Sequence, residues 1–207
     1  MPRMTQPDHL QVRVIVLAGP SGSGKSRLTR RLGLPTLVLD DFYKDGDDPT
    51  LPRIQLAGGA AIVDWDSAES WNAASAMATI DELCRHGRAQ VPTYDIATSR
   101  RTGSRSLELG GARYVVAEGI FAQEIVAGCR TRGVLADGIC VTQHPLITFA
   151  RRLGRDLSEH RKPPWVLLRR GIHLALEQRR VVQHAVELGC RPMHPEAAFR
   201  ELSRLVG

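Results

Sequence analysis

Short apolar runs alternate with segments of helical spacing along most of the chain. Four runs rich in valine, isoleucine and leucine have the length of buried parallel strands, and they cover residues 12–18, 36–40, 113–118 and 134–141. Apolar positions at helical spacing predict helices over residues 24–32, 67–85, 145–160 and 164–188, and a short helix that opens at Pro195. This alternation predicts an α/β fold in which helices flank a parallel sheet.

The segments between these elements are polar or rich in turn-forming residues. Residues 41–59 contain many Asp, Pro and Gly residues and are predicted to form a loop. Residues 101–108 are interpreted as a small hairpin around a turn at Thr102-Gly103. No internal repeat or Ser/Gly-rich linker divides the chain, so we expect one domain over residues 1–207.

Composition narrows the class of protein. The chain has 207 residues, of which 43% are apolar and 24% charged, as in ordinary globular proteins. No apolar run approaches the roughly 18 residues of a membrane span, and the polar first eleven residues lack a signal-peptide core. We therefore expect a cytoplasmic protein without membrane contact. The four cysteines form no CxxC pair or metal-ligand spacing, which favours reduced, mostly buried thiols over a disulfide or zinc role.

The positive charge is concentrated near the C-terminus. Residues 151–207 hold 12 Lys and Arg against 6 Asp and Glu, so the whole net charge of +6 lies in this part of the chain. Such an excess favours polyanionic partners such as nucleotides or nucleic acid. The alternative for most of these arginines is a solvated helical surface.

A phosphate-binding loop (P-loop) is the strongest motif. Residues 19–26 match G-x-x-x-x-G-K-[ST] at every fixed position, after an apolar strand and before a helix. Backbone N–H groups and the helix N-terminus can hold phosphate oxygens there, Lys25 can reach the β- and γ-phosphates, and Ser26 can ligate Mg²⁺. No guanine-reading N-K-x-D run is found. We expect ATP and Mg²⁺, with nucleotide contacts from Gly19, Pro20, Ser21, Gly22, Ser23, Gly24, Lys25 and Ser26.

Acidic residues follow two of the predicted strands. Asp40 ends the strand over residues 36–40 and Asp41 follows it, while Glu118 ends the strand over residues 113–118. The carboxyl ends of parallel strands face one crevice, so these groups are expected near the P-loop. Asp40 is a candidate catalytic base and metal ligand, and Glu118 a candidate metal ligand. A cap or solvated turn is the alternative for both Asp40 and Asp41, and it is the favoured interpretation for Asp41. A surface carboxylate at the end of a strand is the alternative for Glu118.

Together these motifs resemble the uridine kinase (uridine–cytidine kinase) branch of the P-loop kinases, which is related to phosphoribulokinase and pantothenate kinase. The similarity runs over about residues 12–162, and after the P-loop it includes Asp-Asp-Phe-Tyr-Lys-Asp (40–45), Asp-Trp-Asp-Ser-Ala-Glu-Ser-Trp (64–71), Val-Pro-Thr-Tyr-Asp (91–95), Glu-Gly-Ile (118–120) and Arg-Arg-Leu-Gly-Arg-Asp-Leu-Ser-Glu (151–159). The resemblance implies an ATP-dependent kinase that phosphorylates a small hydroxylated molecule, most directly the 5′-hydroxyl of a nucleoside such as uridine or cytidine.

The resemblance also implies roles on the acceptor side. Asp40 matches the aspartate that activates the 5′-hydroxyl, Tyr43 matches an aromatic residue beside the nucleoside, and Tyr94 matches a residue of the base pocket. Asp66 matches an aspartate that binds ribose hydroxyls, and Arg152 matches its arginine partner. From the residues alone, capping of the following helix is an equal interpretation of Asp66, and packing an equal one of Tyr94.

On the donor side, the resemblance implies a lid over about residues 152–163 and a helical C-terminal part over 164–207. Arg155 and Lys162 match basic lid residues that close on ATP, with Arg155 acting at the transferring phosphoryl group, and Glu118 matches a magnesium-associated glutamate. A closed lid excludes water and limits wasteful hydrolysis.

One departure bears on the acceptor. The family has a histidine that reads the pyrimidine where this chain has Ser99. A kinase for another alcohol, such as a sugar, a pantothenate-like molecule or a secondary metabolite, is therefore an open alternative. A nucleotide-dependent nucleic-acid-binding or regulatory module is an alternative of another class, but the chain lacks a groove-reading motif or an RNA-stacking aromatic cluster. Nucleic acid is thus not expected as a partner, and a homo-oligomer is left open.

Overall fold

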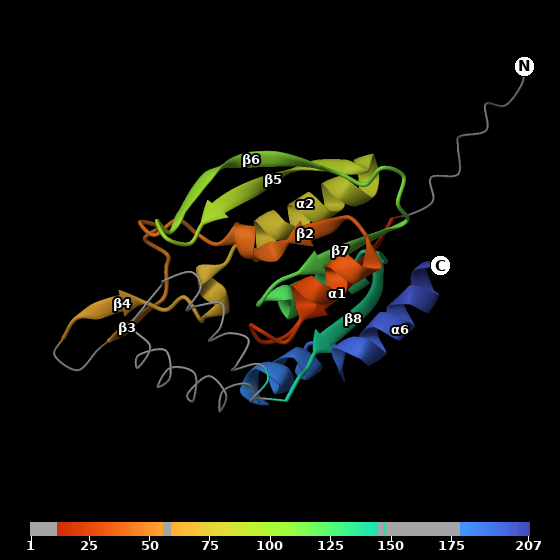
Figure 1. Cartoon of the computed structure of the whole chain (residues 1–207). Coiled ribbons are helices and arrows are strands. Elements are labelled where there is room, and N and C mark those ends of the chain that lie inside the picture. The colour runs from red at the N-terminus through yellow and green to blue at the C-terminus, as the bar shows by residue number, and fades with distance from the viewer. Residues whose placement is uncertain (1–11, 56–58, 145–146, 148–178) are drawn as a thin grey trace, which may run out of the picture.

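A computed structural model of the chain describes residues 12–55, 59–144, 147 and 179–207. At its centre is a five-stranded parallel sheet with the strand order β2-β7-β1-β8-β9 (Figure 1). These strands are β1 (Arg13–Ala18), β2 (Thr36–Val38), β7 (Tyr114–Glu118), β8 (Leu135–Val141) and β9 (Arg191–Met193). The sheet confirms the predicted α/β fold.

Helices cover both faces of the sheet, because alternate residues of the central strand β1 point to opposite sides. On one side, α1 (Lys25–Leu32) and α6 (Pro195–Val206) pack against each other and against the sheet. On the other side, α2 (Ala73–His86) and α3 (Val126–Thr131) contribute to a second and larger apolar cluster. The segment that follows β1 is therefore anchored at the middle of the fold.

The helix predicted over residues 67–85 begins later, at Ala73. The side chain of Asn72 caps α2 by accepting a hydrogen bond from the N–H of Ser75. Before it, Ser67 caps a separate 3₁₀ turn, η2 (Ala68–Ser70). The predicted end is confirmed, since Gly87 adopts a left-handed conformation with a φ of 69° directly after α2.

The strand predicted over residues 36–40 ends early, at Val38. It is followed by a 3₁₀ turn, η1 (Leu39–Phe42), which carries Asp40. The buried indole N–H of Trp71 donates to the carbonyl of Leu39 at 2.6 Å. This hydrogen bond satisfies a carbonyl group that would otherwise pair with a neighbouring strand, and it therefore favours the turn. Asp40 therefore lies just beyond the sheet edge rather than at the end of the strand.

Two antiparallel hairpins lie outside the central sheet (Figure 1). In the longer one, β5 (Arg88–Asp95) pairs with β6 (Arg100–Glu108), and the chain reverses at residues 96–99. The predicted turn at Thr102-Gly103 is wrong, because Gly103 lies within the ladder opposite Thr93. The sequence pattern missed β5 because a proline interrupts its apolar alternation.

Three short strands were also missed. β3 (Arg53–Gln55) and β4 (Ala61–Val63) form the second hairpin, and β3 lies inside the region 41–59 predicted as loop. β9 adds a fifth strand to the central sheet beside β8. Each of these strands has three residues, which is too few for a hydrophobic pattern to be read.

Some predictions fall outside the described residues. These are the helix over residues 145–160, except for Ile147, and the lid over about 152–163, including Arg152, Arg155 and Lys162. Of the helix predicted over 164–188, residues 179–187 are described and are helical.

The short helix predicted at Pro195 is confirmed as α6. Cys129, Cys140 and Cys190 are buried free thiols, and Cys84 is half-buried. In the part of the chain that the structure describes, no helix is long and apolar enough to cross a membrane.

Candidate active site

The P-loop joins β1 to α1 at the carboxyl edge of the sheet. Gly19 has a φ of 130°, and a Cβ at this position would lie 2.5 Å from the carbonyl oxygen of Val141 in β8. Only glycine therefore lets the loop pack this closely on β8. Among the described residues, no side chain caps α1, so its first N–H groups can face an anion.

The ammonium group of Lys25 is held at the loop itself. Its Nζ donates to the carbonyl oxygens of Gly19 at 2.7 Å and Pro20 at 3.3 Å. Both acceptors are neutral, and a phosphate oxygen is a stronger partner for an ammonium group. The side chain is thus positioned for an entering triphosphate.

Ser26 and Glu118 form the pair of oxygen groups predicted to hold a metal. The Ser26 hydroxyl donates to Oε2 of Glu118 at 3.3 Å, from the first turn of α1 to the end of β7. Burial raises the pKa of Glu118, and the nearby Lys25 ammonium and the Ser26 hydrogen bond oppose this shift.

Within the described ranges, no group of three or more His, Cys, Asp or Glu side chains could hold a metal by itself. Magnesium often needs only one or two protein oxygens, because substrate phosphates and water complete its shell. The hydroxyl of Ser26 and the carboxylate of Glu118 are hard oxygen ligands, and they fit such an ion.

Asp40 lies against the end of β7 through a contact that depends on Gly119. Its Oδ1 accepts a hydrogen bond from the backbone N–H of Ile120 at 3.0 Å. A Cβ on Gly119 would lie 2.8 Å from the Cβ of Leu39 and 2.9 Å from Oδ1 of Asp40. The absent side chain therefore lets η1 approach β7 and brings Asp40 near Glu118, whose pKa the Asp40 charge helps to raise.

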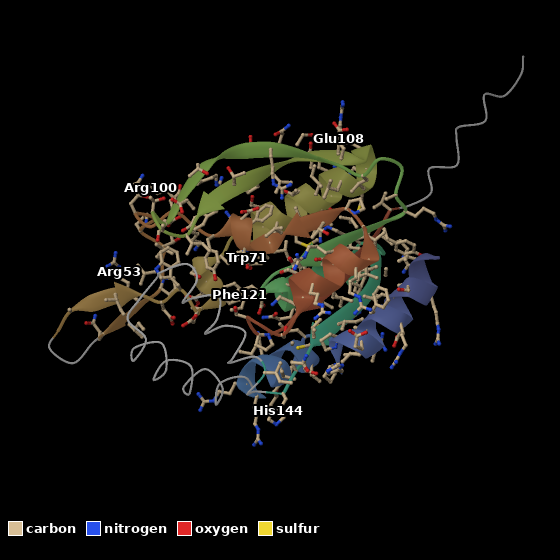
Figure 2. All side chains as sticks on the ribbon, in the orientation of Figure 1. Arg53, Trp71, Arg100, Glu108, Phe121 and His144 are labelled. Atoms are coloured by element: carbon tan, nitrogen blue, oxygen red, sulfur yellow. The ribbon has the colours of Figure 1, made fainter. Side chains whose placement is uncertain are left out.

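An aromatic group surrounds Tyr43, which follows η1. Its ring centroid lies 5.9 Å from Trp65, 5.8 Å from Tyr94 and 5.9 Å from Phe121. Trp71 and Phe121 lie near each other, with ring centroids 6.3 Å apart (Figure 2). Such a group of rings can form the wall of a site for a flat or cyclic molecule.

Asp66 lies near this aromatic group and does not cap a helix. The caps of η2 and α2 are Ser67 and Asn72, so the capping interpretation of Asp66 is wrong. Its backbone N–H donates to Oδ1 of Asp64, and its side chain is exposed. Its negative charge is close enough to help raise the pKa of Tyr43, although burial of the phenol is the main cause.

Asp41 connects η1 to the long hairpin. Its Oδ1 accepts the backbone N–H of Tyr94 at 3.4 Å, and its Oδ2 lies 3.8 Å from Arg105. Burial raises the pKa of Asp41, and these two contacts partly offset that shift. The predicted alternative, a cap or solvated turn, is replaced by a structural link between segments.

Ser99 lies beside Tyr94 at the reversal of the hairpin. Of the described non-glycine residues it alone has a positive φ, of 52°. Its carbonyl accepts the N–H of Gly46 at 2.7 Å, and its side chain hydrogen-bonds with Tyr94, whose phenol donates to the carbonyl of Lys44 at 3.1 Å. These contacts fix Ser99 at the place where the resemblance puts the base reader.

Sequence reasoning missed a pocket on the other side of the P-loop. Its volume is about 220 Å³, and it lies between Gly24, the exposed face of α1, the segment after β8 and the start of α6. Arg27, Gln143 and His194 line it. The one available signal was the position of Arg27 directly after the P-loop, since the other two residues lie far away in the sequence.

The structure thus brings together most of the residues predicted from the sequence. Lys25, Ser26, Asp40 and Glu118 gather at the carboxyl edge of the sheet, with Tyr43 beside them. Tyr94 contacts Tyr43, and the negative charge of Asp66 helps to raise the pKa of Tyr43. The structure does not describe the three residues predicted in the lid region, which are Arg152, Arg155 and Lys162.

Comparison with known proteins identifies relatives of similar sequence. The chain is 32% identical over 168 residues to a uridine kinase of Deinococcus deserti, and the match covers 75% of this chain and 74% of that protein. It is 29% identical over 160 residues to a uridine kinase of Schizosaccharomyces pombe, covering 74% of this chain but 34% of the yeast protein. No protein-family profile matches the chain.

A third relative has a different name. An inorganic pyrophosphatase of Arabidopsis thaliana is 29% identical over 163 residues, which cover 73% of this chain. The chain spans only 22% of the plant protein's length.

Among solved structures, a candidate fructose transport system kinase from Silicibacter sp. TM1040 has the same fold. The TM-score is 0.59 at 19% sequence identity, and the match covers 87% of this chain and 88% of the other.

Proposed function

The chain belongs to the uridine kinase family, and from this premise we propose that it transfers the γ-phosphate of ATP to the 5′-hydroxyl of a nucleoside such as uridine or cytidine. The coarser activity follows from the family: the protein is a P-loop kinase that phosphorylates a hydroxyl group of a small molecule. The proposal concerns the acceptor and the residues that act on it.

One observation carries this proposal. Asp40 hydrogen-bonds to the backbone just after β7, while Glu118 at the end of β7 contacts Ser26 of the P-loop helix. Only Gly119 separates Glu118 from Ile120, so the carboxylate of Asp40 lies close to the Ser26–Glu118 pair. Asp40 is suited to activate a hydroxyl, and the pair is suited to hold Mg²⁺ on ATP. Phosphoryl transfer requires this proximity of acceptor and donor groups.

On the donor side, the P-loop backbone would hold the phosphates of ATP. Ser26 and Glu118 would hold Mg²⁺, which supplies positive charge at the phosphate oxygens when bound. Lys25 would exchange the carbonyls of Gly19 and Pro20 for the β- and γ-phosphates.

On the acceptor side, Asp40 would orient the hydroxyl and accept its proton. Its Oδ1 is fixed by the Ile120 N–H, which leaves Oδ2 to face the acceptor. The ring of Tyr43 and its aromatic neighbours would pack on the nucleoside, and the exposed carboxylate of Asp66 would accept hydrogen bonds from ribose hydroxyls. Tyr94 would lie at the base.

The lid belongs to the proposal through the family resemblance. Arg155 and Lys162 would close on the phosphates of ATP, and Arg152 would pair with Asp66 at the ribose. An arginine at the transferring group stabilises charge in the transition state.

A second candidate acceptor is favoured by Ser99. The hydroxyl at this position is shorter than a histidine side chain, and it hydrogen-bonds with Tyr94. This arrangement favours an acceptor that offers hydroxyl groups instead of a pyrimidine edge, such as a sugar or another small alcohol.

The test is an ATP-consumption screen with Mg²⁺ against uridine, cytidine, other nucleosides, pantothenate and simple sugars, with mass detection of the product. A 5′-monophosphate formed from uridine or cytidine would support the nucleoside proposal. Turnover of a different alcohol alone would replace it with the second candidate. Silence on every acceptor, together with salt-dependent binding of RNA or DNA, would contradict both.

A further inference from the structure

The long hairpin is irregular at the end that carries Tyr94. Its ladder pairs Thr93 with Gly103 and then Tyr94 with Arg101, so Thr102 is an extra residue in β6. Such a β-bulge interrupts the regular hydrogen bonds between two strands, and bulges beside active sites often redirect a side chain. The backbone groups of the pair after the bulge, Tyr94 and Arg101, can therefore be used by another part of the chain.

Two aspartates accept the N–H groups of this pair. The backbone N–H of Tyr94 donates to Oδ1 of Asp41 at 3.4 Å, and that of Arg101 donates to Oδ1 of Asp45 at 2.6 Å. An N–H that donates outside the hairpin points away from the partner strand, as in a non-hydrogen-bonded antiparallel pair, and the two N–H groups of such a pair leave opposite edges of the hairpin. The segment from Asp41 to Asp45 therefore reaches from one edge of the hairpin to the other.

Tyr43 lies at the middle of this segment. Its ring centroid is 5.8 Å from that of Tyr94, and the Tyr94 hydroxyl donates to the carbonyl of Lys44 at 3.1 Å. Just beyond the segment, the N–H of Gly46 donates to the carbonyl of Ser99 at 2.7 Å. Contacts on both sides of Tyr43 thus hold the hairpin end against this part of the chain.

The same segment begins beside the candidate catalytic carboxylate. Asp40 directly precedes Asp41, and its Oδ1 accepts the N–H of Ile120 at 3.0 Å. The second oxygen of Asp41, Oδ2, lies 3.8 Å from the guanidinium group of Arg105 in β6. One short segment is therefore attached both to the end of β7 and to the hairpin. It connects the group that would activate the acceptor hydroxyl to the wall that would hold the rest of the acceptor.

We propose that Asp41 and Asp45 are positioning residues that select the acceptor, because they set the place of the Tyr94 ring relative to Asp40. Neither carboxylate has to touch the acceptor, since each acts through a backbone N–H of the hairpin. The arrangement suits an acceptor whose ring lies at a fixed distance from its hydroxyl, as in a nucleoside. The inference rests on the proposed function, which assigns Asp40 to the hydroxyl and Tyr94 to the base.

The test removes each carboxylate and then restores one of its oxygens. Asp41→Ala and Asp45→Ala remove the group that accepts the N–H, whereas Asp41→Asn and Asp45→Asn keep an oxygen that can accept it. Asp47→Ala is the matched control. It removes a carboxylate of the same loop that pairs with the exposed side chain of Arg100 at 2.8 Å, and an exposed ion pair contributes little.

Steady-state kinetics with uridine as the acceptor separates KM from kcat. Each alanine variant should raise KM for uridine about tenfold, while kcat and KM for ATP stay within about twofold of the wild type. The asparagine variants should recover most of this loss, and Asp47→Ala should match the wild type. An unchanged KM for uridine in both alanine variants would overturn the inference. An equal loss of uridine and ATP affinity would do the same, because it would indicate general damage to the fold.

Amide hydrogen exchange tests the arrangement without an acceptor. The N–H of Tyr94 should exchange at least about tenfold faster in Asp41→Ala, and the N–H of Arg101 in Asp45→Ala, with wild-type rates in the rest of the hairpin. Unchanged rates at both positions would overturn the inference whatever the acceptor is. If the wild type does not phosphorylate uridine but both rates rise as expected, the nucleoside proposal fails and the role of the two aspartates in holding the hairpin is supported.

Discussion

The carboxylate of Asp40 accepts a hydrogen bond from the backbone N–H of Ile120, and this 3.0 Å contact joins two segments that are 80 residues apart. A backbone donor holds one oxygen of Asp40, so no other side chain is needed to orient it. The geometry of the candidate catalytic group therefore depends on how η1 packs against the end of β7.

Asp40→Asn should remove phosphoryl transfer while keeping the fold. The amide oxygen can still accept the Ile120 N–H, but the side chain can no longer take a proton from the acceptor. We expect kcat to fall about 10²- to 10⁴-fold and ADP affinity to stay unchanged. Steady-state kinetics and calorimetry measure the two effects. Near wild-type kcat would mean that Asp40 is not the base.

Gly119→Ala should disrupt the approach of η1 to β7. The new Cβ would lie 2.8 Å from that of Leu39 and 2.9 Å from Oδ1 of Asp40. We expect a loss of about 2 kcal/mol in the free energy of unfolding, with reduced kcat. The control is Gly103→Ala, where the nearest atom would lie at an ordinary 3.5 Å. Equal stability of the two variants in urea would argue against this role of Gly119.

Glu118→Gln should make the ligand-free protein more stable and less active. Burial raises the pKa of Glu118 above its ordinary value, so its contribution to stability is complete below that value and is lost as the pH rises through the raised pKa. At neutral pH the wild type therefore carries an unfavourable buried charge that glutamine lacks.

We expect a gain of about 1 kcal/mol in urea unfolding at neutral pH without Mg²⁺, and the gain should vanish at pH values below the ordinary pKa of glutamate. Activity with Mg²⁺ should fall at least about 100-fold. A variant less stable than the wild type at neutral pH would contradict the electrostatic argument.

Trp71→Phe should destabilise the turn that carries Asp40. The buried carbonyl of Leu39 would lose its hydrogen bond from the indole N–H. An unsatisfied buried acceptor costs about 1 to 3 kcal/mol, so urea unfolding should report a loss in that range. Trp65→Phe is the matched control, since the backbone rather than the indole of Trp65 accepts the Tyr43 hydroxyl. Equal losses in both variants would assign the effect to ring size.

Ser99→His should move the acceptor preference towards pyrimidine nucleosides. The left-handed backbone at this position, with a φ of 52°, is one that histidine adopts more readily than most residues. We expect kcat/KM for uridine or cytidine to rise about tenfold relative to other acceptors, because the imidazole can hydrogen-bond with the base. A competition assay with mixed acceptors measures this ratio. An unchanged ratio would mean that position 99 does not read the acceptor.

The centre of the fold could be predicted because its signals are local in the sequence. The apolar run of β1, the P-loop and the start of α1 follow one another directly, so the hydrophobic pattern and the motif support the same structure. Glu118 could be placed near Ser26 because parallel strands end at one edge of the sheet.

Other features could not be predicted because they depend on contacts between distant segments. Asp41 resembles a turn residue until the hairpin brings Tyr94 and Arg105 against it. The pocket beside the P-loop needs Gln143 and His194, which lie far from Arg27 in the sequence. Neither arrangement leaves a periodic or motif signal, since each exists only after the strands have been ordered.

The late position of β9 and α6 in the chain has a consequence for protein synthesis. A ribosome completes β1, the P-loop and α1 long before it reaches residues 191–206. Until those residues emerge, the buried side chains of Ile139 and Val141 in β8 lack Ala198 and Leu202 of α6 as packing partners. This face of the sheet therefore exposes apolar surface to water during synthesis, and its core is completed only when α6 has folded.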